Sequence, residues 1–474
     1  MAEREIRAHT HMSTDETSGD ILGWLPRAFP AGVPQYLAIV DSIEEGLRNG
    51  RLRPGVRLPP RRTLAKEIGV SLGTITRAYE EAQNRGLVDA QVGRGTYLNA
   101  VPSPAGTTIR GQSVDLSLNV SPSVGEDRVI RRYLRQLADA PSIAEMASYL
   151  PHFGMERHRA DLSAWLAANG VELPASMLAL CCGAQHGIWI AARAAAVRDT
   201  PIITEAATYS GFRALASLEG YTLAGAGLDE HGVRPDEVDR LARETGARLV
   251  YLTPTLQSPT TSVMPLGRRE EIVAVARAHD LTVIEDDAYG MLLPDAPPPL
   301  ATLAPERVFY VTGLSKYLSP MMRLGLLHVP ARFRDVAATA LRTTTWMAPP
   351  LHAELVARMI RDGALEEVVA AKRAEASVRL TEARRILQLD AAGGPAVSYH
   401  LWMPASDRQS AASLAADASA RGIVMAHPDA LEVSADAPPG LRLCLGGPAT
   451  REALYNAVSI VAHLRNAGST RFVI

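Results

Sequence analysis

Apolar side chains recur three and four residues apart from Tyr36 onward, which is the spacing of a helix that buries one face. This first predicted helix ends before the turn at Arg53-Pro54-Gly55. A second, short helix is predicted from about Arg62 to Ile68, and a third from Leu72 or Gly73 to about Arg85. The three apolar stripes, which predict one small shared core, are Tyr36, Ile39, Val40, Ile43 and Leu47; Leu64, Ala65 and Ile68; and Ile75, Ala78, Tyr79 and Ala82.

Two short strands are predicted after the third helix. They are Leu87-Val88 and Thr96-Tyr97-Leu98, and Gly93-Arg94-Gly95 forms the hairpin turn between them. A tight turn at Gly69-Val70-Ser71 separates the second helix from the third. The order helix, helix, turn, helix, hairpin is typical of a winged helix-turn-helix, so residues 31–99 are predicted to form a DNA-binding domain.

The third helix of such a module enters the major groove of DNA with its N-terminal residues near the base edges. Small hydroxyl side chains lie at that end, and arginines flank it. An arginine can bind phosphate or guanine through its planar fork, and Arg94 at the hairpin tip could reach a groove or the backbone. The candidate DNA-binding residues are Arg61, Arg62, Ser71, Thr74, Thr76, Arg77, Gly93, Arg94 and Gly95.

Residues 34–98 also resemble a known family, the GntR-type winged helix of bacterial repressors and activators. The motifs that carry the resemblance are Leu58-Pro59-Pro60-Arg61-Arg62-Thr63-Leu64-Ala65, Gly69-Val70-Ser71, Thr74-Ile75, Ala78-Tyr79 and Gly93-Arg94-Gly95-Thr96-Tyr97. The resemblance implies that the partner is double-stranded operator DNA. Leu72 stands where many relatives carry Arg, so the sequence of the operator stays open.

The rest of the chain has a different pattern. Residues 1–30 are predicted to be a flexible tail, and residues 100–113, rich in Pro, Gly, Ser and Thr, a linker. In residues 114–474 short apolar strands alternate with helices, which favours an α/β fold with a mostly parallel sheet covered on both faces. The clear strand candidates are Pro201–Ile203, Arg248–Leu252, Thr282–Glu285 and Val308–Val311. A long helix around Leu351–Arg385 and strands at Val397–Met403 and Arg442–Leu445 predict a small C-terminal α+β subdomain.

Charge and cysteine content narrow the function classes. The 474-residue chain has a net charge of −2, but residues 31–100 carry ten Lys and Arg against seven Asp and Glu, the sign expected of a DNA-facing module. Its three cysteines lack the spacing of a metal site or a disulfide framework, so no metal is predicted and a cytoplasmic location fits. Because no apolar run is long enough to span a membrane, no membrane partner is predicted.

Lys316 follows an apolar strand and is one of only three lysines in a chain with 46 arginines; this signal is weak alone and becomes stronger together with its surroundings. A lysine in an apolar setting offers an amine that can lose its proton and attack a carbonyl, as guanidinium cannot. Gly183-Ala184-Gln185 opens a helix whose N–H groups could bind phosphate, Tyr209 could stack on a flat ring, and Asp286 and Tyr289 follow a strand end. An amine, a phosphate cradle, an aromatic, a carboxylate and a phenol are the groups that pyridoxal 5′-phosphate requires.

In this order, the motifs of about residues 114–474 resemble fold-type I aminotransferases. The resemblance implies that Lys316 forms the Schiff base, that Asp286 partners the pyridine nitrogen, and that Tyr289 donates to the ring oxygen. It also implies that Arg442 grips the carboxylate of an effector, and that Tyr149 reaches the phosphate of a neighbouring subunit in a homodimer. The implied cofactor-binding residues are Lys316, Asp286, Tyr289, Tyr209, Ala184, Gln185, Ser258, Ser315, Arg323 and Tyr149.

Two positions depart from the aminotransferase pattern. Ser258-Pro259-Thr260-Thr261 stands where the family usually has Asn-Pro-Thr-Gly, and the shorter serine side chain would not reach as far as the Asn amide. Gly313 lies three residues before the lysine, where Ser or Thr usually binds phosphate, and Thr312 is one residue away. Both departures weaken the case for a fast transaminase.

A GntR-type winged helix joined to an aminotransferase-like domain resembles the MocR-type transcriptional regulators. The resemblance implies a domain-swapped, head-to-tail homodimer whose DNA-binding geometry is set by the cofactor together with an amino compound. Our hypothesis is that the protein senses this compound by forming an external aldimine with bound pyridoxal phosphate. A working aminotransferase with an accessory winged helix is one alternative, and the departures at Ser258 and Gly313 count against it. A repressor whose large domain is only a dimerisation scaffold is the other, and Lys316, Asp286, Tyr289 and Arg442 count against that reading.

Overall fold

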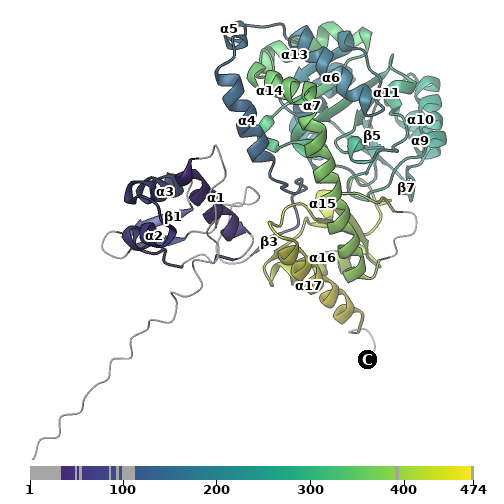
Figure 1. Ribbon diagram of the computed structural model, residues 1–474. Helices are drawn as coiled ribbons and strands as arrows, with labels where there is room; N and C mark the ends of the chain where they lie inside the picture. The colour runs from purple at the N-terminus through teal and green to yellow at the C-terminus, as the bar shows by residue number, and fades with distance from the viewer. Residues whose placement is uncertain are drawn as a thin grey trace, which may run out of the picture. The chain divides into compact units, whose positions relative to one another are not determined.

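The computed structural model describes residues 34–48, 51–52, 56–84, 87–91, 95–98, 113–389 and 394–470. They fall into two compact units, which divide at about residue 104 (Figure 1). The tail predicted over residues 1–30, most of the predicted linker, and Gly93 and Arg94 at the predicted hairpin tip lie outside the described residues.

The first unit has three helices followed by a hairpin, in the order that the sequence pattern predicts. Its elements are α1 (Gln35–Arg48), α2 (Arg61–Ile68), α3 (Leu72–Asn84), β1 (Val88–Gln91) and β2 (Gly95–Leu98). The predicted apolar stripes form its core, where Ile39, Ile43, Leu64 and Ile75 are completely buried. Gly69, in the left-handed conformation at φ 69°, ends α2 and turns the chain toward α3, as the predicted tight turn requires.

The hairpin of this unit is widened by a third segment. Strands β1 and β2 pair antiparallel, with Val88 opposite Leu98. Residues 56–58 then join the outer side of β2, because Leu58 N–H donates to Thr96 O and Leu98 N–H donates to Val56 O. These bonds attach the wing to the loop before α2, so the wing and the two helices of the helix-turn-helix form one body.

A seven-stranded sheet forms the centre of the second unit, in the order β4-β12-β11-β10-β9-β5-β6. Strand β12 pairs antiparallel with both neighbours, and the other neighbouring pairs are parallel. The predicted mostly parallel sheet is therefore confirmed. Its strands are β4 (Leu178–Cys181), β5 (Ile202–Glu205), β6 (Leu223–Ala226), β9 (Leu249–Leu252), β10 (Thr282–Asp286), β11 (Val308–Gly313) and β12 (Gly325–His328).

Helices cover both faces of this sheet, which explains why its strands are apolar at nearly every position. Along β9 the side chains alternate between two cores: Leu249 and Tyr251 belong to one, Val250 and Leu252 to the other. One face packs on α7 (Ala184–Ala195), α8 (Ser210–Glu219) and α13 (Arg334–Thr344). The other packs on α4 (Glu126–Ala138), α6 (Glu156–Ala168), α9 (Pro235–Thr245), α10 (Leu266–Ala278), α11 (Leu300–Leu303) and α14 (Pro350–Arg361). The short elements are α5 (Ser142–Met146), α12 (Leu314–Tyr317), β7 (Leu228–Asp229) and β8 (Gly232–Val233).

The predicted α+β subdomain lies at the C-terminal end of the second unit, and α15 (Ala364–Leu387) connects it to the sheet domain (Figure 1). Its other elements are β3 (Val114–Asp115), β13 (His400–Pro404), α16 (Arg408–Ser419), β14 (Ile423–Val424), β15 (Gly440–Cys444) and α17 (Arg451–Thr470). Strand β13 pairs with β15, and β3 pairs with β14. Strand β3, at the start of the second unit, thus belongs to the same subdomain as the strands and helices at its end.

The single long helix predicted at Leu351–Arg385 is wrong: the structure has two helices, α14 and α15, that meet at Gly363. Gly363 adopts φ 73°, which a side chain would strain, and the chain changes direction there. The predicted strand at Val397–Met403 also begins later than expected, at His400.

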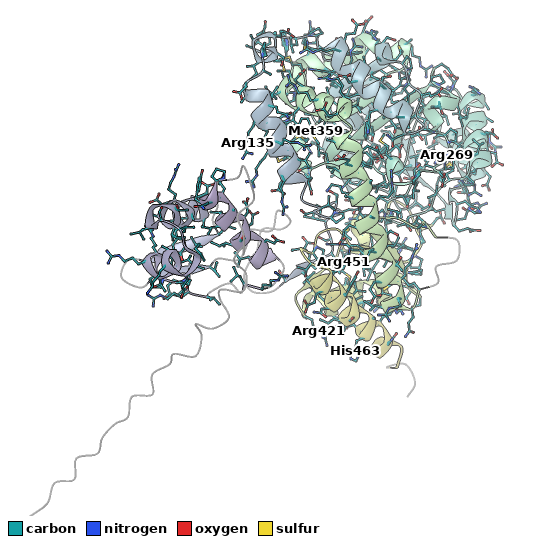
Figure 2. All side chains as sticks on the ribbon, in the orientation of Figure 1. Arg135, Arg269, Met359, Arg421, Arg451 and His463 are labelled. Carbon is teal, nitrogen blue, oxygen red and sulfur yellow. The ribbon has the colours of Figure 1, made fainter. Side chains whose placement is uncertain are left out.

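Two of the arginines labelled in Figure 2, Arg269 and Arg451, connect neighbouring elements of the second unit. Arg269 of α10 is fully buried, lies 3.5 Å from Glu285 of β10 and donates to Thr255 Oγ1 at 2.9 Å. It therefore holds the loop after β9 against the next strand. Arg451 at the start of α17 donates to Glu375 of α15 at 2.6 Å, which joins the two long helices of the subdomain.

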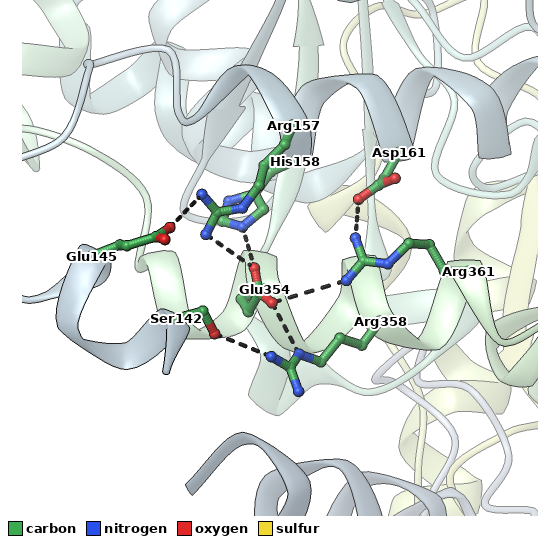
Figure 3. A network of polar contacts seen from close by, with 8 residues as sticks. All are labelled: Ser142, Glu145, Arg157, His158, Asp161, Glu354, Arg358 and Arg361. Carbon is green, nitrogen blue, oxygen red and sulfur yellow. Dashed lines mark hydrogen bonds and ion pairs between the residues drawn. The ribbon is translucent and has the colours of Figure 1, made fainter. Parts of the chain in front are cut away.

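A second polar network surrounds the buried carboxylate of Glu354 on α14 (Figure 3). His158 lies 2.8 Å from Glu354 Oε2, Arg358 donates to Oε1 at 2.9 Å, and Arg157 donates to Oε2 at 3.3 Å. Burial alone would raise the pKa of Glu354, but these donors lower it to about 2. The network ties α6 to α14 through one ionised side chain.

Replacing Glu354 by glutamine is expected to lower the free energy of unfolding by about 2 kcal/mol at pH 7. Two arginines and a histidine share both oxygens of the buried carboxylate, and glutamine leaves them one uncharged acceptor oxygen. Since folding depresses the pKa of Glu354, its contribution is complete above about pH 5 and is lost as the pH falls toward 2. Urea unfolding of both proteins at several pH values measures this. An equal difference at pH 3 and pH 7 would contradict the assignment.

In the part of the chain that the structure describes, every helix is too short or too polar to cross a membrane.

Candidate cofactor site and DNA interface

Polar side chains gather where the parallel strands of the large sheet end. Asp286 is the last residue of β10, Glu205 is the last residue of β5, and Lys316 follows β11 in the short helix α12. The carboxyl ends of parallel strands meet at one edge of a sheet, which is where open α/β folds bind ligands. This edge is the candidate site.

Lys316 presents its amine at this edge. Its Nζ donates to the backbone carbonyl of Asn119, and Tyr399 Oη donates to the carbonyl of Lys316 at 2.9 Å. Burial, together with the nearby cation Arg442, lowers the pKa of the Lys316 amine from 10.5 to about 8. The neutral, nucleophilic amine is therefore more populated near pH 7 by roughly two orders of magnitude than in a free lysine.

Asp286 lies buried beside Lys316 and is held by the neighbouring strand. Tyr251 of β9 donates to its Oδ2 at 2.6 Å. Its other oxygen, Oδ1, is among the buried side-chain atoms of the described residues that have no hydrogen-bond partner. Burial raises the pKa of Asp286 to about 6, and the adjacent Asp287 acts in the same direction. A protonated nitrogen placed at Oδ1 would satisfy this oxygen and favour its ionised form.

Tyr289 belongs to a second group of contacts at the same edge. The amide of Asn119 donates through Nδ2 to Tyr289 Oη at 2.7 Å and also lies 3.0 Å from His400 Nδ1. The Lys316 amine lies 5.8 Å from the centre of the Tyr289 ring. Burial raises the pKa of Tyr289, so its hydroxyl keeps its proton. Tyr289 is therefore both a hydrogen-bond acceptor from Asn119 and a donor to whatever faces it.

Arg442 projects from β15 into the same region and is buried. Its Nη1 donates to Ser258 Oγ at 3.1 Å, and its Nη2 donates to the carbonyl of Ser117 at 2.9 Å. Its Nε is buried without a partner among the described residues. Ser258, which stands where the resemblance leads one to expect Asn, thus orients the guanidinium of Arg442. The Nε–H of Arg442 stays available to a ligand.

The N-terminus of α7 lies next to β11 and β12. A β-carbon added to Gly313 would lie 3.1 Å from the amide nitrogen of Ala184, and one added to Gly325 would lie 2.5 Å from the carbonyl carbon of Gly183. The strands therefore approach the first turn of the helix so closely that a Ser or Thr at 313 would crowd it. Helix N-termini present unpaired N–H groups, which suit a phosphate.

Other residues of the predicted phosphate site surround this helix end. Arg323 is exposed, donates through Nη2 to Cys182 O at 3.0 Å, and would lie 2.7 Å from a β-carbon on Gly183. Gln185 donates to Gly211 O at 2.9 Å, and its Oε1 has no partner among the described residues. Ser315 is half-buried one residue before the lysine. Thr312 is committed elsewhere, since its hydroxyl donates to Asp287 O at 2.8 Å.

Two predicted aromatic residues have different surroundings. Tyr209 precedes α8, and its ring lies so close to Gly211 that an added β-carbon there would be 2.3 Å from Tyr209 Cζ. Tyr149 is 78% exposed and packs against Trp346 at 4.9 Å between ring centroids. The role predicted for Tyr149 in a neighbouring subunit stays a prediction.

In the first unit, the hydroxyl residues predicted to face DNA lie at the start of α3. Ser71 Oγ accepts from Thr74 N–H at 3.0 Å and lies 2.8 Å from the Thr74 hydroxyl, so it caps the helix. Thr76 is half-buried one turn along. Leu72, 45% exposed at the same end, offers an apolar surface of the kind that contacts a thymine methyl group.

The predicted arginines lie on the helices of this unit. Arg61, at the start of α2, lies 5.9 Å from the centre of the Tyr79 ring, and Arg77 of α3 lies 4.8 Å from that of Tyr36. Arg62 is exposed. Gly95 begins β2, while Gly93 and Arg94 lie outside the described residues. The aromatic rings hold two of the arginine side chains in defined directions.

Comparison with known families adds the decisive observation. Residues 35–98 match the model described as "Bacterial regulatory proteins, gntR family", and residues 112–459 match that of "Aminotransferase class I and II". The chain belongs to the class I and II aminotransferases, fused to a gntR-family module. This fusion is the architecture of MocR-type transcriptional regulators, so the resemblance inferred from the sequence is confirmed.

Three matches show what this MocR-type protein is similar to. The HTH-type transcriptional regulator YdeF of Bacillus subtilis is 24% identical over 473 residues, which cover 94% of this chain and 97% of that protein. The pyridoxine biosynthesis transcriptional regulator PdxR of Corynebacterium glutamicum is 28% identical over 326 residues, 65% of this chain and 69% of that protein. The crystal structure of LysN, the α-aminoadipate aminotransferase of Thermus thermophilus, matches with a TM-score of 0.67 at 20% identity over 76% of this chain and 93% of LysN, which shows the same fold.

The class I and II aminotransferase domain implies pyridoxal 5′-phosphate as the cofactor, and the residues at the sheet edge fit it. Lys316 has an amine of lowered pKa, and Asp286 has a buried carboxylate oxygen that finds no hydrogen-bond partner in the described part of the chain. Gly183 and Gly313 keep the start of α7 free of side chains. Lys316, Asp286 and the helix end would therefore hold the aldehyde, the ring nitrogen and the phosphate of the cofactor.

Sequence reasoning missed Asn119, Tyr251, Gln257 and His400. A tyrosine inside the apolar strand β9, next to the strand that ends in Asp286, was a signal for Tyr251, because Tyr251 lies opposite Ile284 in parallel register. His400 is likewise a polar residue in an otherwise apolar strand segment. Asn119 carried no such signal, since it lies in a loop far from its partners in the sequence.

Proposed function

We propose that this MocR-type protein binds operator DNA with an affinity that changes when a small amino compound carrying a carboxylate occupies the site at the sheet edge. The observation that carries the proposal is the meeting, at one edge, of the Lys316 amine, the unpartnered oxygen of Asp286 and the unspent N–H of Arg442. Bound pyridoxal phosphate would supply an aldehyde carbon that a primary amine can attack. The other groups of the site, above all Arg442, would then select which amine reaches this carbon.

Arg442 supports the choice of a carboxylate. Ser258 Oγ and Ser117 O hold the plane of its guanidinium, so a carboxylate would meet an oriented fork. Burial of Arg442 strengthens the interaction, since water does not compete for the same N–H groups. An amine without a carboxylate would leave this buried cation unpaired, which disfavours it as an effector.

One short segment supports coupling between the site and the DNA-binding unit. Ser117 and Asn119 accept hydrogen bonds through their carbonyls from Arg442 and Lys316, respectively. The same segment begins at β3, immediately after the residues that lead from the DNA-binding unit. When the Lys316 amine binds another group, it no longer donates a hydrogen bond to Asn119 O. An effector that frees this amine therefore changes the contacts of the segment that continues toward the DNA-binding unit.

Replacing Arg442 by glutamine tests this reading. Because glutamine lacks the charged fork, the concentration of a carboxylate-bearing amine needed to change DNA affinity is expected to rise at least about tenfold, while cofactor binding persists. The probe is the DNA upstream of the chain's own coding sequence, and its fluorescence anisotropy reports DNA affinity. Titrations with pyridoxal phosphate, and then with a panel of amino acids and matched decarboxylated amines, give the concentrations of cofactor and of effector that change this affinity.

The panel also separates the alternatives. Decarboxylated amines that act as well as amino acids would contradict the role of Arg442. Steady conversion of an amino acid and a keto acid, with no change in DNA affinity, would favour the working aminotransferase. A DNA affinity that changes with neither the cofactor nor the amines would favour a repressor whose large domain is only a dimerisation scaffold.

A further inference from the structure

A chain of hydrogen bonds runs from the backbone carbonyl of Gln257, through the side chains of His400 and Asn119, to the hydroxyl of Tyr289. His400 Nε2 lies 3.1 Å from the carbonyl of Gln257, and His400 Nδ1 lies 3.0 Å from Asn119 Nδ2. Asn119 Nδ2 lies 2.7 Å from Tyr289 Oη. His400 is completely buried at the start of β13, and its ring centre lies 5.6 Å from that of Tyr289. One group in this chain, the carbonyl of Gln257, can only accept, and this fixes which of the other groups donate and which accept.

Because the carbonyl of Gln257 can only accept, His400 Nε2 must carry a hydrogen. The imidazole is neutral, because it is buried and lies near the cations Arg442 and Lys316, which together lower its pKa to about 3. A neutral imidazole with its hydrogen on Nε2 has a lone pair on Nδ1. The Ser398 hydroxyl, 3.4 Å from Nδ1, is more distant than Asn119.

The lone pair on His400 Nδ1 determines how the amide of Asn119 is turned. Only the NH₂ group can donate to Nδ1, so Nδ2 faces His400 and its second hydrogen points to Tyr289 Oη. Asn119 Oδ1 is consequently turned away, and it is buried without a partner among the described residues. Because Tyr289 Oη accepts from Asn119, its own hydrogen is directed away from Asn119 and toward the region of Lys316.

From this arrangement we propose that His400 is a positioning residue, which fixes the Asn119 amide so that Tyr289 presents its hydroxyl hydrogen to the ring oxygen of the cofactor. The inference rests on the proposed cofactor site. Ser258 accepts from Arg442, and the two hydrogens of Asn119 Nδ2 are directed to His400 and Tyr289. Tyr289 is therefore the member of this chain that is left to donate to the ring oxygen. Without His400, the Asn119 amide can turn over and accept the Tyr289 hydrogen through Oδ1.

The test uses the full chain with pyridoxal phosphate and follows the visible absorbance of the cofactor linked to Lys316 as the pH changes. A hydrogen bond to the negatively charged ring oxygen stabilises the unprotonated linkage and lowers the pH at which the band changes. His400→Phe removes both hydrogen-bonding nitrogens and is expected to raise this midpoint by about one pH unit. His400→Asn keeps an oxygen near the position of Nδ1 and is expected to restore most of the wild-type midpoint.

Two further variants keep the result interpretable. His328, a buried histidine of β12 whose Nδ1 lies 3.0 Å from Val308 O, is the matched control, and His328→Phe is expected to leave the midpoint unchanged. Asn119→Leu breaks the same chain at its next member and is expected to raise the midpoint as His400→Phe does. It decides the question if His400→Phe fails to fold.

The outcomes separate this inference from the proposed function. A wild-type protein that shows no visible band with pyridoxal phosphate would overturn both. A wild-type band with a midpoint that neither His400→Phe nor Asn119→Leu shifts would overturn the positioning role and leave the cofactor site intact. A shift equal in His328→Phe would also overturn it, because the effect would then reflect general loosening of the fold.

Discussion

Replacing Lys316 by alanine is expected to abolish covalent attachment of the cofactor and, with it, every response of DNA affinity to amino compounds. The other two lysines cannot take its place. Lys66 belongs to α2 of the DNA-binding unit, and Lys372 is completely buried, with its amine donating to Ser121, Pro122 and Glu126. Lys316 is thus the one primary amine of the described residues at the sheet edge.

The same substitution is expected to leave the fold intact. The Lys316 amine donates to a single backbone carbonyl, and burial already disfavours its charged form. Absorbance after gel filtration with pyridoxal phosphate measures cofactor attachment. Circular dichroism measures the fold, and DNA anisotropy measures the response to amino compounds. Lys66→Arg, which removes a lysine but keeps the charge, serves as the control. A Lys316→Ala protein whose DNA affinity still follows amino compounds would contradict the proposed switch.

Replacing Arg61 and Arg62 together by alanine is expected to weaken DNA binding about a hundredfold at moderate salt and to make its salt dependence shallower by about two counterions. Both side chains lie at the start of α2, Arg61 beside the Tyr79 ring and Arg62 exposed. Each removed contact with phosphate no longer releases a counterion, so both affinity and slope fall.

A matched pair on the other unit separates local contact from net charge. Arg131→Ala with Arg135→Ala removes two exposed arginines from α4 and changes the net charge by the same amount. DNA affinity is expected to change less than about threefold in that protein. Equal losses in the two double variants, or an unchanged affinity after loss of Arg61 and Arg62, would show that the DNA-binding face has been assigned wrongly.

The sequence pattern predicted what depends on local spacing. Apolar runs located β9, β10 and β11, and the positions of Asp286 and Lys316 at their ends followed because parallel strands share one edge. The break of the long helix was missed, because a single glycine at 363 is tolerated in many helices and only its φ of 73° shows that the chain turns there.

Contacts between distant segments could not be predicted in the same way. Asn119 and His400 are 281 residues apart, and Arg442 and Ser117 are 325 apart. They meet because β3, at the start of the second unit, pairs with β14 near its end, and β13 pairs with β15. That pairing arises from the packing of the whole subdomain, so no local signal revealed that the loop after β3 would pass between Lys316 and Arg442.

Both the proposed switch and the positioning role of His400 require attachment of the cofactor to Lys316. Borohydride reduction of the protein with pyridoxal phosphate, followed by peptide mass mapping, measures this attachment most directly. With only three lysines in the chain, each falls in a different tryptic peptide. The mass of the reduced cofactor is expected on the peptide that contains Lys316. A cofactor mass found on Lys66 or Lys372 instead, or on no lysine, would contradict this attachment.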